Sequence, residues 1–436
     1  MLVKPKLEYG CEAYASACKS LLETLEPVQN KAIRIATGAY RSTPWLSLCA
    51  ESGFKPLRYS RDQKLLNYLL RIFSSNNYPL QDEIINHDRD LNTNQFIQKS
   101  FVSRAKEIIT RYDLNFSSVI PQEVLSKPPW EAKLKICNEL FHIKKNEYTP
   151  LEIRALYYDH MQESNHGNIF YTDGSKIHTR VGYAVVWANR IISERLLDYS
   201  SIFTAELYAI ETAIDLAISQ QLQSITIATD SKSSILALMN TAPKHELIKS
   251  IRNKSTEIDI NVQLCWTPSH INISGNERAD KEAKKSLDRI LISNKRIPRS
   301  DYKAIIKHAV RDKWREEWAN LTRNKYRDVT DNPIPLPGSS SQNRQWERTL
   351  ARLRLGHSHL THSFIMDSGT NPAPNCNQCG AELTIEHILT DCVYLTSERF
   401  ICFNNEYPSL ASILNSNFDR NSLFRYLNMI NVYNEI

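Results

Sequence analysis

The chain has 436 residues, of which 42% are hydrophobic and 23% charged, and its formal net charge is +6. This composition excludes collagen-like chains and indicates a globular protein long enough for two to four domains. No apolar run reaches transmembrane length, and the start lacks a signal-peptide core. We therefore expect an intracellular protein, cytoplasmic or nuclear, with reduced thiols, no membrane partner and a basic excess that suits a polyanion.

Residues 1–75 carry a helical period. Lysine and arginine side chains lie opposite an apolar face that comprises Leu22, Leu25, Val28, Ala32, Ile35 and Ala36. Two interpretations stay open for this region: a helical segment that binds nucleic acid, and an ordinary helical bundle with a solvated basic face. Residues 76–165 are polar and weakly patterned, so they are predicted to be a partly helical linker.

Residues 166–290 alternate short apolar strands with helices. Three strands come first, and strand–helix alternation follows, which predicts an α/β fold with a mixed five-stranded sheet flanked by helices. The expected strands are residues 168–175, 182–188, 190–198, 224–230 and 260–266, and the expected helices are 203–220, 231–240 and 275–286. After residue 300 a helix is expected in which Trp314 and Trp318 lie one turn apart.

Four acidic residues occupy positions in this region where a carboxylate is costly. Asp173 lies inside a strand, Asp230 ends another, and Glu206 and Asp280 lie beside the apolar faces of helices. Each alone has an ordinary explanation, such as a turn residue, a helix N-terminal acid or an N-cap. Together they would repel one another unless divalent cations lay between them. We therefore expect two Mg²⁺ ions, with Mn²⁺ as an alternative.

The sequences "YTDGSK", "FTAELYAI", "ATDSKSS" and "WTPSHINISGNERADKEAK" resemble, in order, the four motifs of ribonuclease H. The resemblance implies the RNase H-like fold and a two-Mg²⁺ site formed by Asp173, Glu206, Asp230 and Asp280. It also implies that His270, ten residues before the last aspartate, assists proton transfer or product release. The implied reaction is endonucleolytic hydrolysis of the RNA strand of an RNA–DNA hybrid, leaving 5′-phosphates, without a small-molecule cofactor.

The resemblance also implies contacts with the substrate, and these depart in part from the pattern of the family. Gly174 and Ser175 are expected to contact the RNA strand, and Ser231 is a further candidate contact. Where bacterial-type enzymes carry asparagines before the helix glutamate, this chain reads "SSIFTAE". Ser201 and Thr204 are therefore the expected substitutes in the contact with the DNA strand. No long basic insertion follows Asp230, so a separate basic handle for the hybrid is not expected.

The segment "CNQCGAELTIEHILTDC" has the spacing C-x₂-C-x₇-H-x₄-C. Two thiolates two residues apart can bind one metal ion, and a later His and Cys can complete a tetrahedron, which predicts a structural Zn²⁺ site. Its ligands are Cys376, Cys379, His387 and Cys392, and the alternative is four unrelated core residues. The preceding "RQWERTLARLRLGHSHLTH" is basic and suits a phosphate backbone. Its His357, His359 and His362 are expected at solvated helix positions, with zinc ligation as the alternative.

The two ends of the chain resemble segments of non-LTR retrotransposons. Residues 1–75 are similar to the thumb-like part that follows the polymerase palm, and the 300–436 region is similar to the tail with a CCHC zinc motif at 376–392. No paired-aspartate polymerase motif is present. The resemblance therefore implies the downstream part of a reverse transcriptase, with nucleic acid as its partner.

Three functions remain open from the sequence. The first is an active Mg²⁺-dependent ribonuclease that acts on hybrids. The second is a catalytically idle, nucleic-acid-binding remnant of a retroelement. The third is a related two-metal enzyme, an exonuclease or integrase, which His270 and the "GNERAD" helix disfavour.

Overall fold

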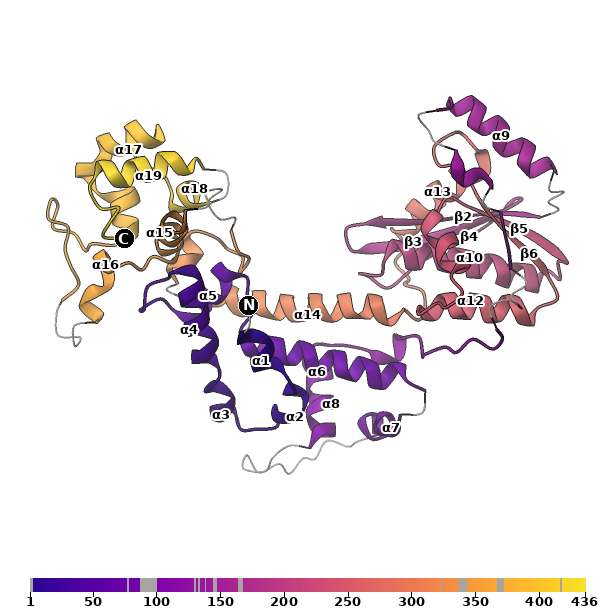
Figure 1. The fold of residues 1–436 in the computed structure, drawn as a ribbon, viewed down its shortest axis with the longest axis horizontal. Helices are drawn as coiled ribbons and strands as arrows, with labels where there is room; N and C mark the ends of the chain where they lie inside the picture. Colours follow the sequence, from indigo (N-terminus) through magenta and orange to yellow (C-terminus); the bar gives the residue numbers. More distant parts are fainter. Residues whose placement is uncertain are drawn as a thin grey trace. The chain divides into compact units, whose positions relative to one another are not determined.

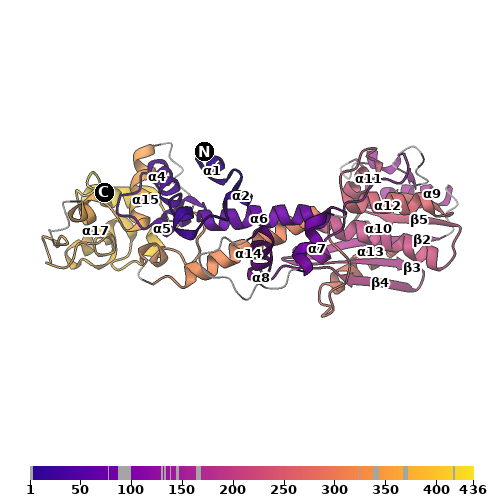
Figure 2. The same ribbon diagram turned by 90° about the horizontal axis from the view of Figure 1, so that it is seen from below.

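The computed structural model describes residues 3–76, 78–86, 100–128, 131, 134–137, 139–143, 147–163, 168–322, 324–336, 343–366, 372–415 and 418–436 (Figures 1 and 2). The chain forms two compact units. The first combines Met1–Leu65, Asp90–Arg104 and Ala309–Ile436, and the second combines Leu66–Arg89 and Ala105–His308. No helix within the described ranges has both the length and the apolar character needed to cross a bilayer.

The second unit is an α/β domain built on a mixed six-stranded sheet in the order β1-β6-β5-β2-β3-β4. The hairpins β2–β3 and β3–β4 are antiparallel, whereas β2–β5, β5–β6 and β1–β6 are parallel. The strands are β1 (Leu134–Cys137), β2 (Ile169–Ile177), β3 (Arg180–Trp187), β4 (Arg190–Arg195), β5 (Ser224–Thr229) and β6 (Asn261–Trp266). The predicted α/β class and mixed sheet are confirmed.

The prediction of five strands is one strand short. The missed strand, β1, is the four-residue segment "LKIC" in a polar stretch, and it pairs in parallel with β6, more than a hundred residues away in the sequence. A segment this short carries no readable period, so its strand conformation depends on the tertiary pairing. Part of the region that the sequence assigns to a linker therefore belongs to the sheet.

Two helices cover opposite faces of the sheet. A Cβ atom at Gly174 would meet α10 (Ile202–Ser219), whereas one at Gly182 would meet the side chain of Ser286 in α13 (Ser274–Ser286). Gly174 pairs directly with Tyr183, the neighbour of Gly182 on β3. Because adjacent strand residues point to opposite faces, α10 and α13 must lie on different sides. The two glycines let both helices approach the sheet closely.

The remaining helices of this unit include one that the sequence analysis missed. The segment "ELIKSIRNKSTE" forms α12 (Glu246–Glu257), in which Leu247, Ile248 and Ile251 are buried. Its Lys254 pairs with Asp215 of α10 at 2.6 Å. The other helices of this unit are α7 (Pro79–Asn86), α9 (Pro150–Glu163) and α11 (Lys232–Met239), whereas α6 (Leu57–Ser74), α8 (Phe101–Arg111) and α14 (Arg299–Ala319) contribute residues to both units.

The first unit is helical and joins the start of the chain to its end. Ile33 and Leu48 share a hydrophobic core with Trp314, Trp318 and Leu355, and the two tryptophan rings lie 5.8 Å apart as expected. The helices are α1 (Val3–Glu8), α2 (Cys11–Tyr14), α3 (Lys19–Glu23), α4 (Glu26–Thr37), α5 (Trp45–Ser52), α15 (Arg344–Leu355), α16 (His359–His362), α17 (Thr396–Phe403), α18 (Leu410–Leu414) and α19 (Arg420–Met429).

The apolar face predicted for residues 22–36 is wrong. Pro27 lies at the start of α4 and separates it from α3, so the segment is two helices with different faces. The buried residues of α4 are Gln29, Asn30 and Ile33, whereas Ile35 is 70% exposed. A single helical period applied to both helices therefore assigns the wrong residues to the buried face.

Candidate active site and metal centre

Three of the predicted carboxylates converge at one end of the sheet. Asp173 comes from the middle of β2, Asp230 directly follows β5, and Glu206 lies in the first turns of α10. Each offers an oxygen, and these oxygens all lie within 4.8 Å of one another. The parallel register that pairs Thr172 with Thr229 brings the two aspartates to the same level of the sheet. The topology therefore gathers residues that lie 57 positions apart in the sequence.

Local structure turns Glu206 inward. The Ser201 hydroxyl accepts a hydrogen bond from the Thr204 amide at 3.1 Å and caps α10, which places Glu206 on the first turns facing the sheet. Gly174 lies beneath it, and a Cβ atom there would approach the Glu206 amide nitrogen to 3.0 Å. Gly174 is buried and Ser175 is 8% exposed. Gly174 therefore has a packing role, because it lets α10 approach β2 closely. Its contact with the substrate stays a prediction.

The electrostatics of the three carboxylates are unfavourable without a cation. Burial, followed by the charges of Asp230 and Asp280, raises the pKa of Asp173 to about 8. Burial and the charge of Asp173 also raise the pKa of Glu206, and burial raises that of Asp230. Within the described residues, the buried Oε2 of Glu206 has no hydrogen-bond partner. Closely spaced oxygens with this charge fit a hard divalent cation such as Mg²⁺.

Asp280 and His270 lie at the margin of the cluster. Asp280 is outside the group of three, and its carboxylate accepts a hydrogen bond from Lys284 Nζ at 2.7 Å on the same helix. Its charge nevertheless raises the pKa of Asp173. His270 is exposed in the loop before α13, with a φ of 60°, and its charge lowers the pKa of Asp230. Both residues are therefore within electrostatic reach of the cluster.

Sequence reasoning missed two residues that hold Asp230 in place. Asn276 is 4% exposed, and a hydrogen bond from its side chain lowers the pKa of Asp230. The indole nitrogen of Trp266 donates to the Asp230 carbonyl at 3.2 Å. The signal for Asn276 was present, because it lies four residues before Asp280 and thus on the same face of α13.

The carboxylate cluster predicts a pH-dependent stability. The raised pKa of Asp173 means that the folded state holds a proton that the unfolded state releases above about pH 4. Stability should therefore fall as pH rises from about 5 to about 8 in EDTA, and Asp173→Asn should be more stable than the parent at pH 8 by about 1–3 kcal/mol. Thermal melts check this, and Mg²⁺ should remove the difference between parent and variant. Equal melting temperatures in EDTA at pH 8 would contradict it.

The predicted contacts at the start of α10 are engaged within the fold. Thr204 is fully buried, and its hydroxyl donates to Asp301 Oδ2 at 2.7 Å. The Ser201 amide and hydroxyl donate to the same oxygen at 2.8 and 3.1 Å. This arrangement leaves Thr204 unavailable for the expected contact with nucleic acid. Ser231 caps α11 through the Ser234 amide at 3.4 Å, so Asp230 is not the N-cap.

Asp301 is a third residue that sequence reasoning missed, and it anchors the helix that carries Glu206. It is 6% exposed and its Oδ2 atom accepts three hydrogen bonds from Ser201 and Thr204, so Asp301→Ala would leave these donors without that partner. We expect a loss of about 2–4 kcal/mol in the free energy of unfolding. Urea unfolding measures this, with Asp312→Ala of the same helix as the control, since Asp312 is half-exposed and pairs with Arg315. Equal stabilities of the two variants would contradict the anchoring role.

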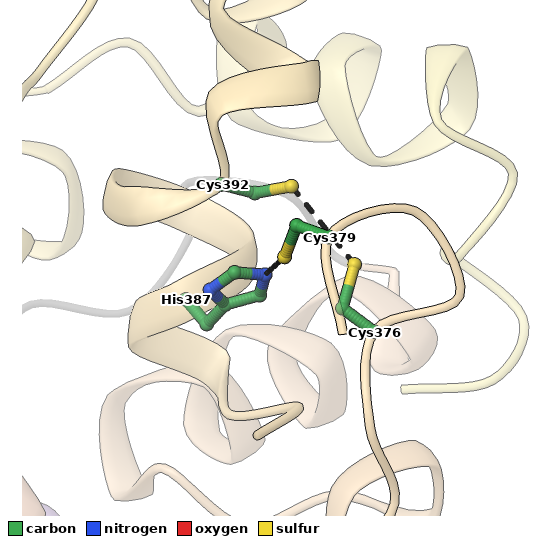
Figure 3. Close-up of side chains that lie close together, drawn as sticks. All are labelled: Cys376, Cys379, His387 and Cys392. Carbon is green, nitrogen blue, oxygen red and sulfur yellow. Dashed lines mark hydrogen bonds between the residues drawn. The ribbon is translucent and has the colours of Figure 1, made fainter. Parts of the chain in front are cut away.

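The second candidate site comprises Cys376, Cys379, His387 and Cys392, whose ligand atoms all lie within 4.8 Å of one another (Figure 3). The Cys376 and Cys392 sulfurs are 3.9 Å apart, and Cys379 Sγ lies 3.2 Å from His387 Nε2. Figure 3 shows the four side chains pointing toward one common space. Three sulfurs and one imidazole nitrogen at this spacing fit a tetrahedral Zn²⁺ ion.

The basic segment before this site is not solvated as expected. The ring centroids of His357 and His362 lie 3.9 Å apart, and burial together with the charges of His362 and Lys325 lowers the pKa of His357 to about 3. Arg354 is 1% exposed and pairs with Glu51 at 3.3 Å. His359 alone of the three histidines is exposed. Among the cationic groups of α15, Arg354 is therefore a buried structural residue of the first unit.

Comparison with a protein-family model supports the assignment of the four motifs. Residues 165–288 match the family model of RNase H. A search of curated proteins found no match. Among solved structures, a foamy viral protease-reverse transcriptase in complex with dsDNA is 23% identical, over 28% of this chain and 96% of that one, with a TM-score of 0.25. The chain thus contains an RNase H domain at residues 165–288.

Proposed function

We propose that the domain at residues 166–290 is an endonuclease that hydrolyses the RNA strand of RNA–DNA hybrids. The observation that carries this proposal is the convergence of Asp173, Glu206 and Asp230 within the stretch that matches the RNase H family. Buried carboxylates that repel one another are a cost to folding that a binding module does not need. They are useful in a site that holds divalent cations for phosphodiester chemistry.

We assign the ligands of two Mg²⁺ ions, or of Mn²⁺, to Asp173, Glu206, Asp230 and Asp280. When bound, such ions lower the pKa of a water molecule and stabilise the leaving 3′ oxygen. Asp280 pairs with Lys284 at 2.7 Å. It would join the ligand set by releasing Lys284 and binding a metal ion instead. Asn276 and Trp266 hold Asp230 in position through its carboxylate and carbonyl groups.

Most of the remaining predicted site residues are proposed to act on the substrate. His270 is exposed, next to the cluster, and free of a strand or helix, so it can transfer a proton or assist product release. Ser175, Ser201 and Ser231 lie around the cluster and are proposed to contact the nucleic acid, whose 2′-hydroxyls and groove shape distinguish a hybrid. Thr204 contributes through the helix cap, not through direct contact.

We further propose that the chain derives from a non-LTR retrotransposon, with a thumb-like segment at 1–75 and a zinc-knuckle-like tail. The segments "VQNKAIRIATGAY" and "ARLRLGHSHLTH" support this origin. One observation favours the alternative, a catalytically idle remnant that binds nucleic acid. Asp280 lies outside the group of three and is paired with Lys284.

The active ribonuclease and the idle remnant differ in whether they cleave an RNA–DNA hybrid. With Mg²⁺ present, the full chain should cleave a labelled RNA–DNA hybrid and leave the same RNA alone, and the same sequence as duplex DNA, intact. Binding measured in parallel shows that each substrate is engaged. Binding of the hybrid without cleavage would support the idle remnant and overturn the ribonuclease, whereas cleavage of duplex DNA would favour an exonuclease or integrase.

A further inference from the structure

A second cysteine and histidine cluster lies in the domain with the sheet, away from the C-terminal zinc candidate. Cys137, His160 and Cys265 each offer one ligand atom, and these atoms all lie within 4.8 Å of one another. They come from β1, α9 and β6 respectively. Two of them, Cys137 and His160, precede residues 165–288, so the family match does not account for this cluster.

The parallel pairing of β1 with β6 creates the cluster. Cys137 lies directly opposite Cys265 in the register, so their side chains share one face of the sheet. His160 reaches them from α9, and its side chain forms a hydrogen bond with Cys137. Glu139 lies at the rim, with its Oε2 atom 3.9 Å from His160 Nε2. Three separate elements therefore present two thiols and one imidazole to the same point.

The burial of the three residues suits a metal site with access from one side. Cys265 is 1% exposed, whereas Cys137 and His160 are partly exposed. The sulfur of Cys137, the histidine ring and the sulfur of Cys265 lie close enough for one ion to contact all three. Gln263 also donates a hydrogen bond to the Cys137 sulfur from the same strand as Cys265.

We propose that Cys137, Cys265 and His160 bind a Zn²⁺ ion. Soft sulfur donors combined with an imidazole are the ligand set that zinc prefers. A water molecule or the Glu139 carboxylate completes a four-coordinate site from the exposed side. A disulfide between the two cysteines would leave His160 without a function in the cluster, and the presence of this third donor favours the metal ion.

A zinc ion at this position would stabilise the edge of the sheet and the strand that supports Asp230. β1 has four residues and lies at the edge of the sheet, where so short a strand gains little from hydrogen bonds alone. A zinc ion fixes β1 and α9 to β6 across three elements. Cys265 is followed by Trp266, whose indole donates to the Asp230 carbonyl. Metal binding is therefore expected to stiffen the strand that supports Asp230.

The test measures zinc bound to the purified full chain after dialysis against Zn²⁺. To remove the C-terminal candidate site, Cys376 and Cys379 are both replaced by serine, and this variant is the background. We expect the background to retain one equivalent of Zn²⁺, and His160→Gln or Cys137→Ser added to it to lose that equivalent. Cys18→Ser in the same background is the control, because Cys18 is exposed and outside both clusters.

Circular dichroism of each variant shows whether it is folded. His160 is partly exposed, so His160→Gln is expected to fold even if a cysteine variant does not. A folded background without zinc would overturn the proposal, as would retention of the equivalent by the folded His160→Gln variant. A Cys137–Cys265 disulfide found by mass spectrometry in the purified parent would also overturn it.

Discussion

Asp173→Asn is expected to abolish hydrolysis of the hybrid while the protein stays folded. Asp173 is central to the cluster, because its carboxylate lies within 4.8 Å of those of both Glu206 and Asp230. The charge of Asp280 also raises its pKa. Asparagine keeps the shape of the side chain but removes the charge that would hold a divalent cation. We expect the rate to fall on the order of 10³-fold or more, about 4 kcal/mol of transition-state stabilisation.

The measurement is single-turnover cleavage of a labelled hybrid by parent and variant at the same Mg²⁺ concentration. Asp215→Asn is the matched control, since Asp215 lies on α10 with Glu206 but pairs with Lys254. The control should cleave at a rate close to that of the parent. An Asp173→Asn variant that cleaves as fast as the parent would show that the metal assignment is wrong.

The second large effect is expected at the C-terminal site. Replacing Cys376 and Cys379 by serine removes two of four ligands, so the Zn²⁺ ion should be lost. The segment between His387 and Cys392 carries Ile388 and Leu389 into the hydrophobic core of the first unit. Without the ion this segment is no longer fixed, and we expect a loss of several kcal/mol in the stability of that unit, a fraction of the roughly 10–16 kcal/mol of structural zinc binding.

Zinc content and thermal unfolding together measure this effect. Cys402→Ser is the control, because Cys402 is buried in the same hydrophobic core but lies outside the ligand group. Binding of nucleic acid is expected to weaken in the double variant, whereas the carboxylate chemistry should remain. Unchanged stability of the double variant, or a parent without zinc at this site, would contradict the zinc assignment.

The features that were predictable from the sequence are those whose signal is local. Apolar runs that end in an acidic residue predict the strands around Asp173 and Asp230. A strong apolar stripe predicts α10. The C-x₂-C spacing likewise predicts a shared ligand site from four residues close in the sequence. These patterns depend on neighbouring residues, so they can be read without the fold.

The features that escaped prediction depend on contacts between distant segments. β1 becomes a strand through pairing with β6, and the meeting of Cys137 with Cys265 depends on that register. Asp301 lies about a hundred residues from the helix cap that it holds. Arg354 appeared to belong to a basic surface, but the fold buries it against Glu51. In each case the partner, and not the local sequence, decides the role.

If the carboxylate site hydrolyses the RNA strand through an activated water, the chemical ends of the products must show it. A 5′-labelled hybrid is incubated with the full chain and Mg²⁺, and the chemistry of the new ends is determined. Attack by water with departure of the 3′ oxygen predicts 5′-phosphate and 3′-hydroxyl ends that are absent with Asp173→Asn. Cyclic 2′,3′-phosphate ends, or cleavage that persists in EDTA, would exclude this mechanism.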